Sequence, residues 1–119
     1  MKIAVTSTGK TLESPMDPRF GRAPFILIVD GDCNLLEVID NASNVNAMRG
    51  AGIQAAKTIA DRKVDMLLTG RCGPNAFSTL EAAGIKVATE QSGTVREAVE
   101  RAKNNQVSIA EKPNAEAHW

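Results

Sequence analysis

The chain has 119 residues, enough for one domain and too few for two. Its 14 basic and 14 acidic side chains balance, so net charge gives no reason to expect nucleic acid or an acidic membrane as the main partner. No apolar run approaches the roughly 20 residues of a membrane-spanning helix, and the N-terminus lacks a signal-peptide pattern, which indicates a cytoplasmic protein.

The first part of the chain is predicted to form three strands joined by turns and loops. Residues 2–8 are rich in strand-forming side chains, and residues 24–30 form the continuous apolar run typical of a strand covered on both faces. The sequence Asp30-Gly31-Asp32 is a turn signal, so residues 35–39 are expected to continue a hairpin as the third strand.

The second part is predicted to alternate helices and strands. Apolar residues recur at helical spacing over residues 50–62, and a later helix begins at Pro74 and ends before Gly84. Thr94 and Glu97 form a capping-box pair that would open a third helix. The two remaining strands are expected at residues 64–69 and 85–88.

Beyond Asn104 the chain is polar, with only a weak strand pattern at residues 107–110. We therefore predict a single domain over residues 1–104 and a polar C-terminal tail over residues 105–119. The order of elements predicts an α/β protein with a ribonuclease-H-like, five-stranded mixed sheet of order 3-2-1-4-5. Strand two would be antiparallel, and helices would cover both faces because parallel crossovers are right-handed.

In this topology several loops leave the same edge of the sheet, where ligands of open α/β sheets usually bind. The converging segments are residues 8–23, 41–49, 70–74 and 89–93. The turn that carries Cys33 lies at the opposite edge, so we expect no disulfide between Cys33 and Cys72. With two cysteines and one histidine, a closed zinc site of four such ligands is impossible.

Three known functional sites are suggested by parts of this sequence or fold, but each lacks residues or elements that it requires. Residues 7–11 resemble the end of a phosphate-binding P-loop, but Ala4 stands where the motif needs glycine and no helix is expected after Thr11. Gly50-Ala51-Gly52 lies too far beyond its strand for a dinucleotide fingerprint. A two-metal nuclease is excluded because residues 2–8 carry no carboxylate.

Two segments at the predicted binding edge suit an anion. Arg19 and Arg22 precede the second strand, and Arg71, Cys72 and Gly73 lie where a helix N-terminus exposes backbone N–H groups. Alternatives remain open: the arginines could pair with carboxylates such as Asp17, and Cys72 could be a buried packing residue. The charged side chains counted on this edge are Lys10, Arg19, Arg22, Arg49 and Arg71 against Glu13, Asp17 and Glu90.

The sequence resembles the dinitrogenase iron–molybdenum cofactor biosynthesis family, which includes NifX-like carriers and the C-terminal part of NifB. The segments that carry the resemblance span most of the chain: residues 19–25 (RFGRAPF), 50–53 (GAGI), 73–77 (GPNAF) with Leu80, 84–87 (GIKV) and 92–95 (SGTV). The resemblance implies the ribonuclease-H-like sheet and binding of iron– or molybdenum–sulfur clusters. It also implies partners among P-loop ATPases or cofactor-assembly proteins.

The free-standing members most similar to this chain include one that holds a molybdenum–copper sulfide cluster without ordinary covalent ligation. Some carriers use histidine in the loop after strand three, but residues 41–49 contain none. We therefore expect a non-catalytic carrier of an anionic molybdenum–sulfur cluster, with or without copper. The expected cluster-binding residues are Arg19, Arg22, Arg71, Cys72 and Gly73, with Cys72 as the candidate thiolate ligand to metal. The alternative is a protein-interaction module that regulates a P-loop ATPase and holds no cluster.

Overall fold

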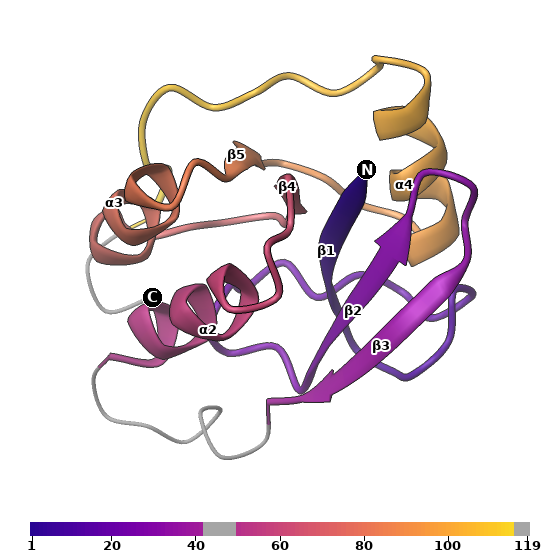
Figure 1. The fold of residues 1–119 in the computed structure, drawn as a ribbon, viewed down its shortest axis with the longest axis horizontal. Helices are drawn as coiled ribbons and strands as arrows, with labels where there is room; N and C mark the ends of the chain where they lie inside the picture. Colours follow the sequence, from indigo (N-terminus) through magenta and orange to yellow (C-terminus); the bar gives the residue numbers. More distant parts are fainter. Residues whose placement is uncertain (42–49, 116–119) are drawn as a thin grey trace.

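The computed structural model describes residues 1–41 and 50–115 (Figure 1). Its elements are β1 (Lys2–Ser7), β2 (Phe25–Asp30), β3 (Leu35–Asp40), α2 (Ala51–Ala60), β4 (Met66–Leu68), α3 (Pro74–Ala82), β5 (Lys86–Ala88) and α4 (Val95–Lys103). The five strands form one sheet of order β3-β2-β1-β4-β5. β2 is antiparallel to β1 and β3, whereas β4 is parallel to β1 and β5. The predicted mixed sheet is therefore confirmed.

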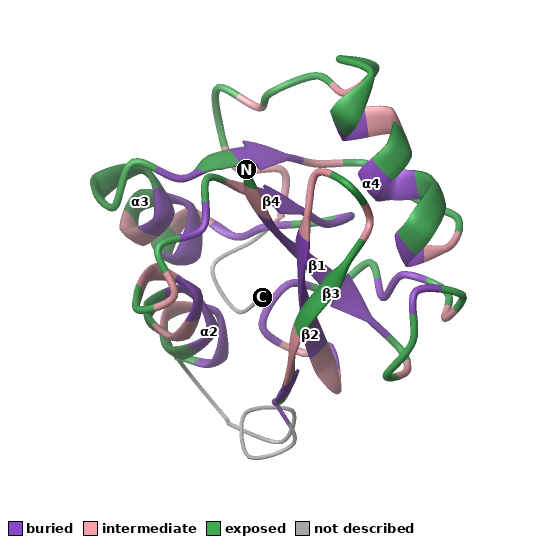
Figure 2. Ribbon diagram, turned by 45° about the vertical axis from the view of Figure 1, so that its right-hand side comes forward, coloured by how far each residue is buried: buried purple, intermediate pink, exposed green. Residues whose placement is uncertain are grey.

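The central strands of the sheet are buried on both faces because helices cover each side. In β1, Ile3 and Val5 pack on the side of α4, while Ala4 between them packs on the side of α2 and α3. This follows from the strand geometry, which points successive side chains to opposite faces. Figures 1 and 2 show α2 and α3 on one side of the sheet and α4 on the other. Each fully buried Val, Leu or Ile side chain stabilises the fold by about 1.5–3 kcal/mol relative to leaving it exposed.

The helix ends follow local chemistry. α3 begins at Pro74, whose missing N–H costs nothing in a first turn. α4 opens with the predicted capping box: Glu97 N–H donates to Thr94 Oγ1 at 3.1 Å, and Thr94 N–H donates to Glu97 Oε1 at 2.9 Å. The hydrogen bond from the Thr94 backbone lowers the pKa of the Glu97 carboxyl. α2 begins after Gly50, whose φ of 75° is in the region that favours glycine.

The segment after β1 does not form a phosphate-binding loop. Thr11 is followed by a turn in which Ser14 N–H donates to the Thr11 carbonyl at 3.1 Å, and no helix lies between Thr11 and β2, a stretch that is described throughout. The predicted departure from a P-loop is therefore confirmed.

The segment after α4 returns across the molecule toward α3, as the yellow trace in Figure 1 shows. No strand forms at residues 107–110, but Ala110 N–H donates to the Val87 carbonyl of β5 at 2.7 Å. Residues 105–115 thus contact the domain, and the boundary at residue 104 stays a prediction. Among the helices of the described residues, none is both long and apolar enough to cross a membrane.

Candidate functional site

The loop after β4 is bound to the loop after β5 at the carboxyl edge of the sheet. Gln91 N–H donates to the Thr69 carbonyl at 3.1 Å, and Glu90 N–H donates to the Gly70 carbonyl at 2.8 Å. Because β4 and β5 are parallel neighbours, both loops leave the sheet in the same direction. The predicted convergence of these two segments is confirmed.

The long loop before β2 reaches the same place. Arg71 N–H donates to the Pro18 carbonyl at 2.6 Å, and Phe20 N–H donates to the Arg71 carbonyl at 3.0 Å. The Phe20 ring is fully buried in the core and anchors this loop. Gly70 is required here, because a Cβ on it would lie 2.7 Å from Pro18 Cα and 2.8 Å from the Pro18 carbonyl oxygen.

A fourth segment joins through Asn114, which sequence reasoning placed in a polar tail. Cys72 N–H donates to Asn114 Oδ1 at 2.8 Å, and Asn114 Nδ2 donates to the Gly70 carbonyl at 3.0 Å. Asn114 N–H also donates to the Cys72 carbonyl at 3.1 Å. No motif indicated this residue, since its partners are backbone groups that leave no mark in the sequence.

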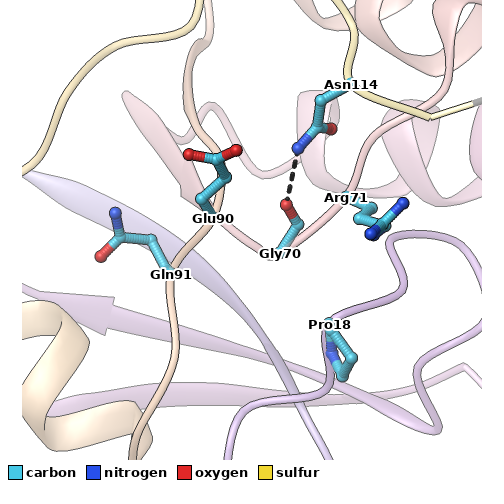
Figure 3. A pocket seen from close by; sticks show the side chains of 6 residues that line it. All are labelled: Pro18, Gly70, Arg71, Glu90, Gln91 and Asn114. Carbon is cyan, nitrogen blue, oxygen red and sulfur yellow. Dashed lines mark hydrogen bonds between the residues drawn. The ribbon is translucent and has the colours of Figure 1, made fainter.

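The four segments surround a hollow of about 320 Å³ (Figure 3). This volume lies at the low end of the range of about 300–1,000 Å³ usual for small-ligand pockets. The residues that line it are Pro18, Gly70, Arg71, Glu90, Gln91 and Asn114. Of these, only Arg71 was predicted as a site residue. The hollow is therefore large enough to take a small ligand, and loops at the sheet edge form it.

The hollow has one basic and one acidic side chain. Among the described residues, neither the Arg71 guanidinium nor the Glu90 carboxylate has a hydrogen-bond or ion-pair partner, and both residues are exposed. Their side chains point in different directions in Figure 3. Glu90 has a φ of 61°, a conformation that residues with a Cβ seldom adopt. Arg71 is thus available to bind an anion, and Glu90 would oppose it.

Arg19 lies beside Arg71 along the backbone, where the two residues form a parallel β-bridge. Its side chain is committed to Asp17: Arg19 Nε lies 3.2 Å from Oδ1 and Nη2 lies 3.1 Å from Oδ2. This hydrogen bond raises the pKa of the Arg19 guanidinium, and the Asp17 side chain is only 5% exposed. The pairing that the sequence left open therefore occurs. Arg22 follows in the same loop, where its N–H donates to the Arg19 carbonyl.

The Cys72 side chain points away from the hollow and into the core with α2 and α3. It is 0% exposed, and its Sγ lies 3.7 Å from the Gly73 carbonyl oxygen. Burial raises the pKa of the Cys72 thiol to about 12, so the thiol is protonated at neutral pH. Metals bind the thiolate, so these surroundings favour packing over ligation. The role of Cys72 toward a metal stays a prediction.

Gly73 is the N-cap of α3, and no side chain caps that helix. The first turn of α3 therefore offers backbone N–H groups and the positive end of the helix dipole. Arg49, one of the basic residues predicted at this edge, and His118, the histidine of the chain, lie outside the described part of the chain. Over residues 1–41 and 50–115, no three His, Cys, Asp or Glu side chains are grouped so that they could hold a metal ion.

The fold and this edge define a class of protein. Residues 1–105 match the dinitrogenase iron–molybdenum cofactor family, and the chain belongs to that family. The structure is similar to that of the apo form of the orange protein from Desulfovibrio gigas, with 44% identity, 96% of each chain covered and a TM-score of 0.91. It is also similar to a solved NifB-type protein of the DUF35 family from Thermotoga, with 32% identity, 97% of each chain covered and a TM-score of 0.81.

An uncharacterised protein of Methanocaldococcus jannaschii is 30% identical over 102 residues, which cover 83% of this chain and 82% of the relative. The family and the similarity to the orange protein indicate a cofactor-related carrier role rather than catalysis. They support a metal–sulfur cluster as the kind of molecule bound, and association with cofactor assembly.

Proposed function

We propose that this protein carries an anionic molybdenum–sulfur cluster, with or without copper, at the hollow beside Arg71. The observation that carries the proposal is the Arg71 guanidinium, which has no partner among the described residues and lines a hollow of about 320 Å³. A guanidinium presents five N–H donors around a permanent positive charge, which suits the sulfide edges of an anionic cluster. Membership of a cofactor family supports this cargo.

The proposed binding is noncovalent. Arg71 would supply charge and hydrogen bonds, and the uncapped start of α3 at Gly73 would add backbone donors. Arg19 and Arg22 would contribute charge from the neighbouring loop, although Asp17 offsets Arg19. The protonated Cys72 thiol supports a cluster held by charge rather than by a thiolate bond.

The proposal is tested by reconstitution of the purified protein with tetrathiomolybdate, with and without Cu(I), read by visible absorption and metal content. We expect a sulfide-to-metal charge-transfer band in the wild-type protein and weaker loading in Arg71→Ala. The matched control is Lys57→Ala, which removes one exposed positive charge from the last turn of α2. Equal loading of both variants would contradict a role for Arg71. Arg71→Lys should retain part of the binding, because lysine keeps the charge but not the planar donor array.

Protein purified from its native host separates this function from the alternative. A coloured, metal-containing protein supports the carrier, whereas a colourless, metal-free protein that retains a bound P-loop ATPase supports an interaction module.

Salt dependence tests the electrostatic part of the proposal. Exposed charges are screened over about 10 Å at 0.1 M ionic strength, so loading should weaken as salt rises. Titration at low and high salt measures this. Equal affinity at both concentrations would favour a buried or directly ligated cluster instead.

A further inference from the structure

We propose that Asn114 is a positioning residue of this site and that residues 110–114 form a strap that completes it. The inference rests on the proposed function for the identity of the cargo. The hydrogen bonds of Asn114, however, are present in the protein without any cargo. Asn114 is half-buried, and its hydrogen bonds run to the backbone groups of Gly70 and Cys72.

The Asn114 amide holds the residues on both sides of Arg71. Its Nδ2 donates to the Gly70 carbonyl, and its Oδ1 accepts from Cys72 N–H, so one planar group bridges the positions before and after the arginine. Figure 3 shows Asn114 above Gly70 with Arg71 at the side of the same hollow. Because the flanking peptide groups are fixed, the direction in which the Arg71 side chain leaves the backbone is fixed as well.

Only an amide of this length supplies both halves of the clamp. An aspartate could accept from Cys72 N–H but could not donate to the Gly70 carbonyl. It would also add a negative charge to the lining of the hollow. Alanine would leave the Cys72 N–H and one acceptor site on Gly70 without their partner.

The strap is fastened at two places. At one end Ala110 N–H donates to the Val87 carbonyl at 2.7 Å, and Ile109 and Ala110 border a second hollow of about 220 Å³ with Phe77. At the other end is Asn114. Between them Glu111 and Lys112 are exposed, and Pro113 restricts the backbone just before the clamp, which lowers the entropy lost when Asn114 docks. Detachment of Asn114 would therefore loosen the Gly70–Cys72 turn, which keeps its hydrogen bonds to Pro18, Phe20 and Glu90, while leaving the core in place.

The first experiment measures the clamp without cargo. In a Cys33→Ser background, Cys72 is the only thiol, and its reaction rate with a disulfide reagent reports opening of the turn. We expect Asn114→Ala to raise that rate about tenfold and to speed amide exchange at Cys72, because hydrogen bonds that hold the turn closed are removed. The control is Ser108→Ala, at an exposed position two residues before the strap. Equal rates in the two variants would overturn the clamp.

The second experiment measures the site, with tetrathiomolybdate and Cu(I) as the probe. Asn114→Ala should load several-fold less than Ser108→Ala. Asn114→Asp should restore only part of the Cys72 amide protection, because it keeps the acceptor for Cys72 N–H but loses the donor to Gly70. It should load no better than Asn114→Ala, because its carboxylate also repels the anion. If Asn114 only stabilised the fold, cluster loading in Asn114→Asp would recover together with the amide protection of Cys72.

The outcomes separate the two proposals. If wild-type protein takes up no chromophore, the proposed function fails, and the clamp is decided by the thiol and amide rates alone. If the wild type loads and Asn114→Ala loads equally well, the carrier stands and the positioning role is overturned.

Discussion

Two turns of this molecule are held in opposite ways. The turn between β2 and β3 is closed by its own side chain: the Asp30 carboxylate accepts from the N–H of Asp32 and Asn34, both at 2.9 Å, and from Asn34 Nδ2 at 3.0 Å. The Gly70–Cys72 turn after β4 has its partners in distant segments. Its hydrogen bonds run to Pro18, Phe20, Glu90 and Asn114, and the bonds to Asn114 span 42 and 44 residues.

The difference shows how a fold can assign stability and function to different edges of one sheet. The turn between β2 and β3 is closed mainly by its own residues, so most changes elsewhere should leave it intact. A turn held by three distant segments forms only when the whole domain has folded, and each segment can adjust it. Arg71 lies at the second kind of turn, so small changes in any of the segments that hold the turn can alter its position.

The largest effect should come from Gly70, because one added methyl group should destabilise the turn after β4 but not the turn between β2 and β3. Gly70→Ala would place a Cβ 2.7–2.8 Å from three atoms of Pro18, and overpacking of this kind costs about 1–3 kcal/mol. Gly31→Ala in the other turn is the control, because a Cβ there meets nothing within 4 Å. Urea unfolding should give a large loss for the first variant and less than about 0.5 kcal/mol for the second. Equal losses of unfolding free energy would mean that Pro18 moves to accommodate the new methyl group without destabilising the fold.

Each of the two turns carries one cysteine, so the same substitution can be compared in both. Cys72→Ser buries a hydroxyl in the core, which should lower the free energy of unfolding by about 1–3 kcal/mol. Cys33→Ser, at a half-buried turn position, should change it by less than about 0.5 kcal/mol. We also expect folded Cys72→Ser to form a coloured complex like that of the wild type. Loss of the chromophore in a variant with an intact fold would show that the thiolate is a ligand.

A smaller effect is expected at Glu90, which opposes Arg71 in the hollow. Glu90→Gln removes a negative charge without changing the size of the side chain, so cargo affinity should rise about two- to fivefold at low salt. Titration of cargo against both proteins at low and high salt measures the gain. Glu81→Gln on α3, an exposed acidic residue that does not line this hollow, is the control. A fall in affinity would show that the carboxylate takes part in binding.

The smallest effect concerns the turn between β2 and β3 and its dependence on pH. Hydrogen bonds from the Asn34 backbone and side chain lower the pKa of the Asp30 carboxyl. Asp30 therefore stabilises the fold above its ordinary pKa of about 3.9, and this stabilisation is lost as pH falls through the folded value. Asp30→Asn should have a slightly lower melting temperature than wild type at pH 7, and the difference should shrink by pH 3. A constant difference would assign the effect to hydrogen-bond geometry rather than to ionisation.

The fold and part of the site could be predicted because their signals are local. Apolar runs defined the strands, Thr94 and Glu97 defined the start of α4, and the sheet order placed Arg71 at the binding edge. Strand β4 was predicted over residues 64–69 but spans Met66–Leu68. Thr69 still donates its N–H to the Ala88 carbonyl of β5, so the pairing with β5 continues one residue past the end of the strand.

The rest of the site could not be predicted because its partners are backbone groups. Asn114 is one polar residue in a polar segment, and its hydrogen bonds to Gly70 and Cys72 depend on where that segment lies after folding. The ion pair of Arg19 with Asp17 was one of two alternatives that residue spacing left open. The choice between them required the turn that brings the two side chains together.

The contact between Ala110 and Val87 has a further consequence for self-association. β5 is an edge strand, and the unpaired backbone groups of an edge can pair with another chain and seed aggregation. Here the edge is three residues long, carries the exposed Lys86, and has its Val87 carbonyl occupied by the strap. The strap therefore shields the edge of the sheet, and removal of residues 106–119 should favour intermolecular strand pairing as well as loosen the turn at Arg71.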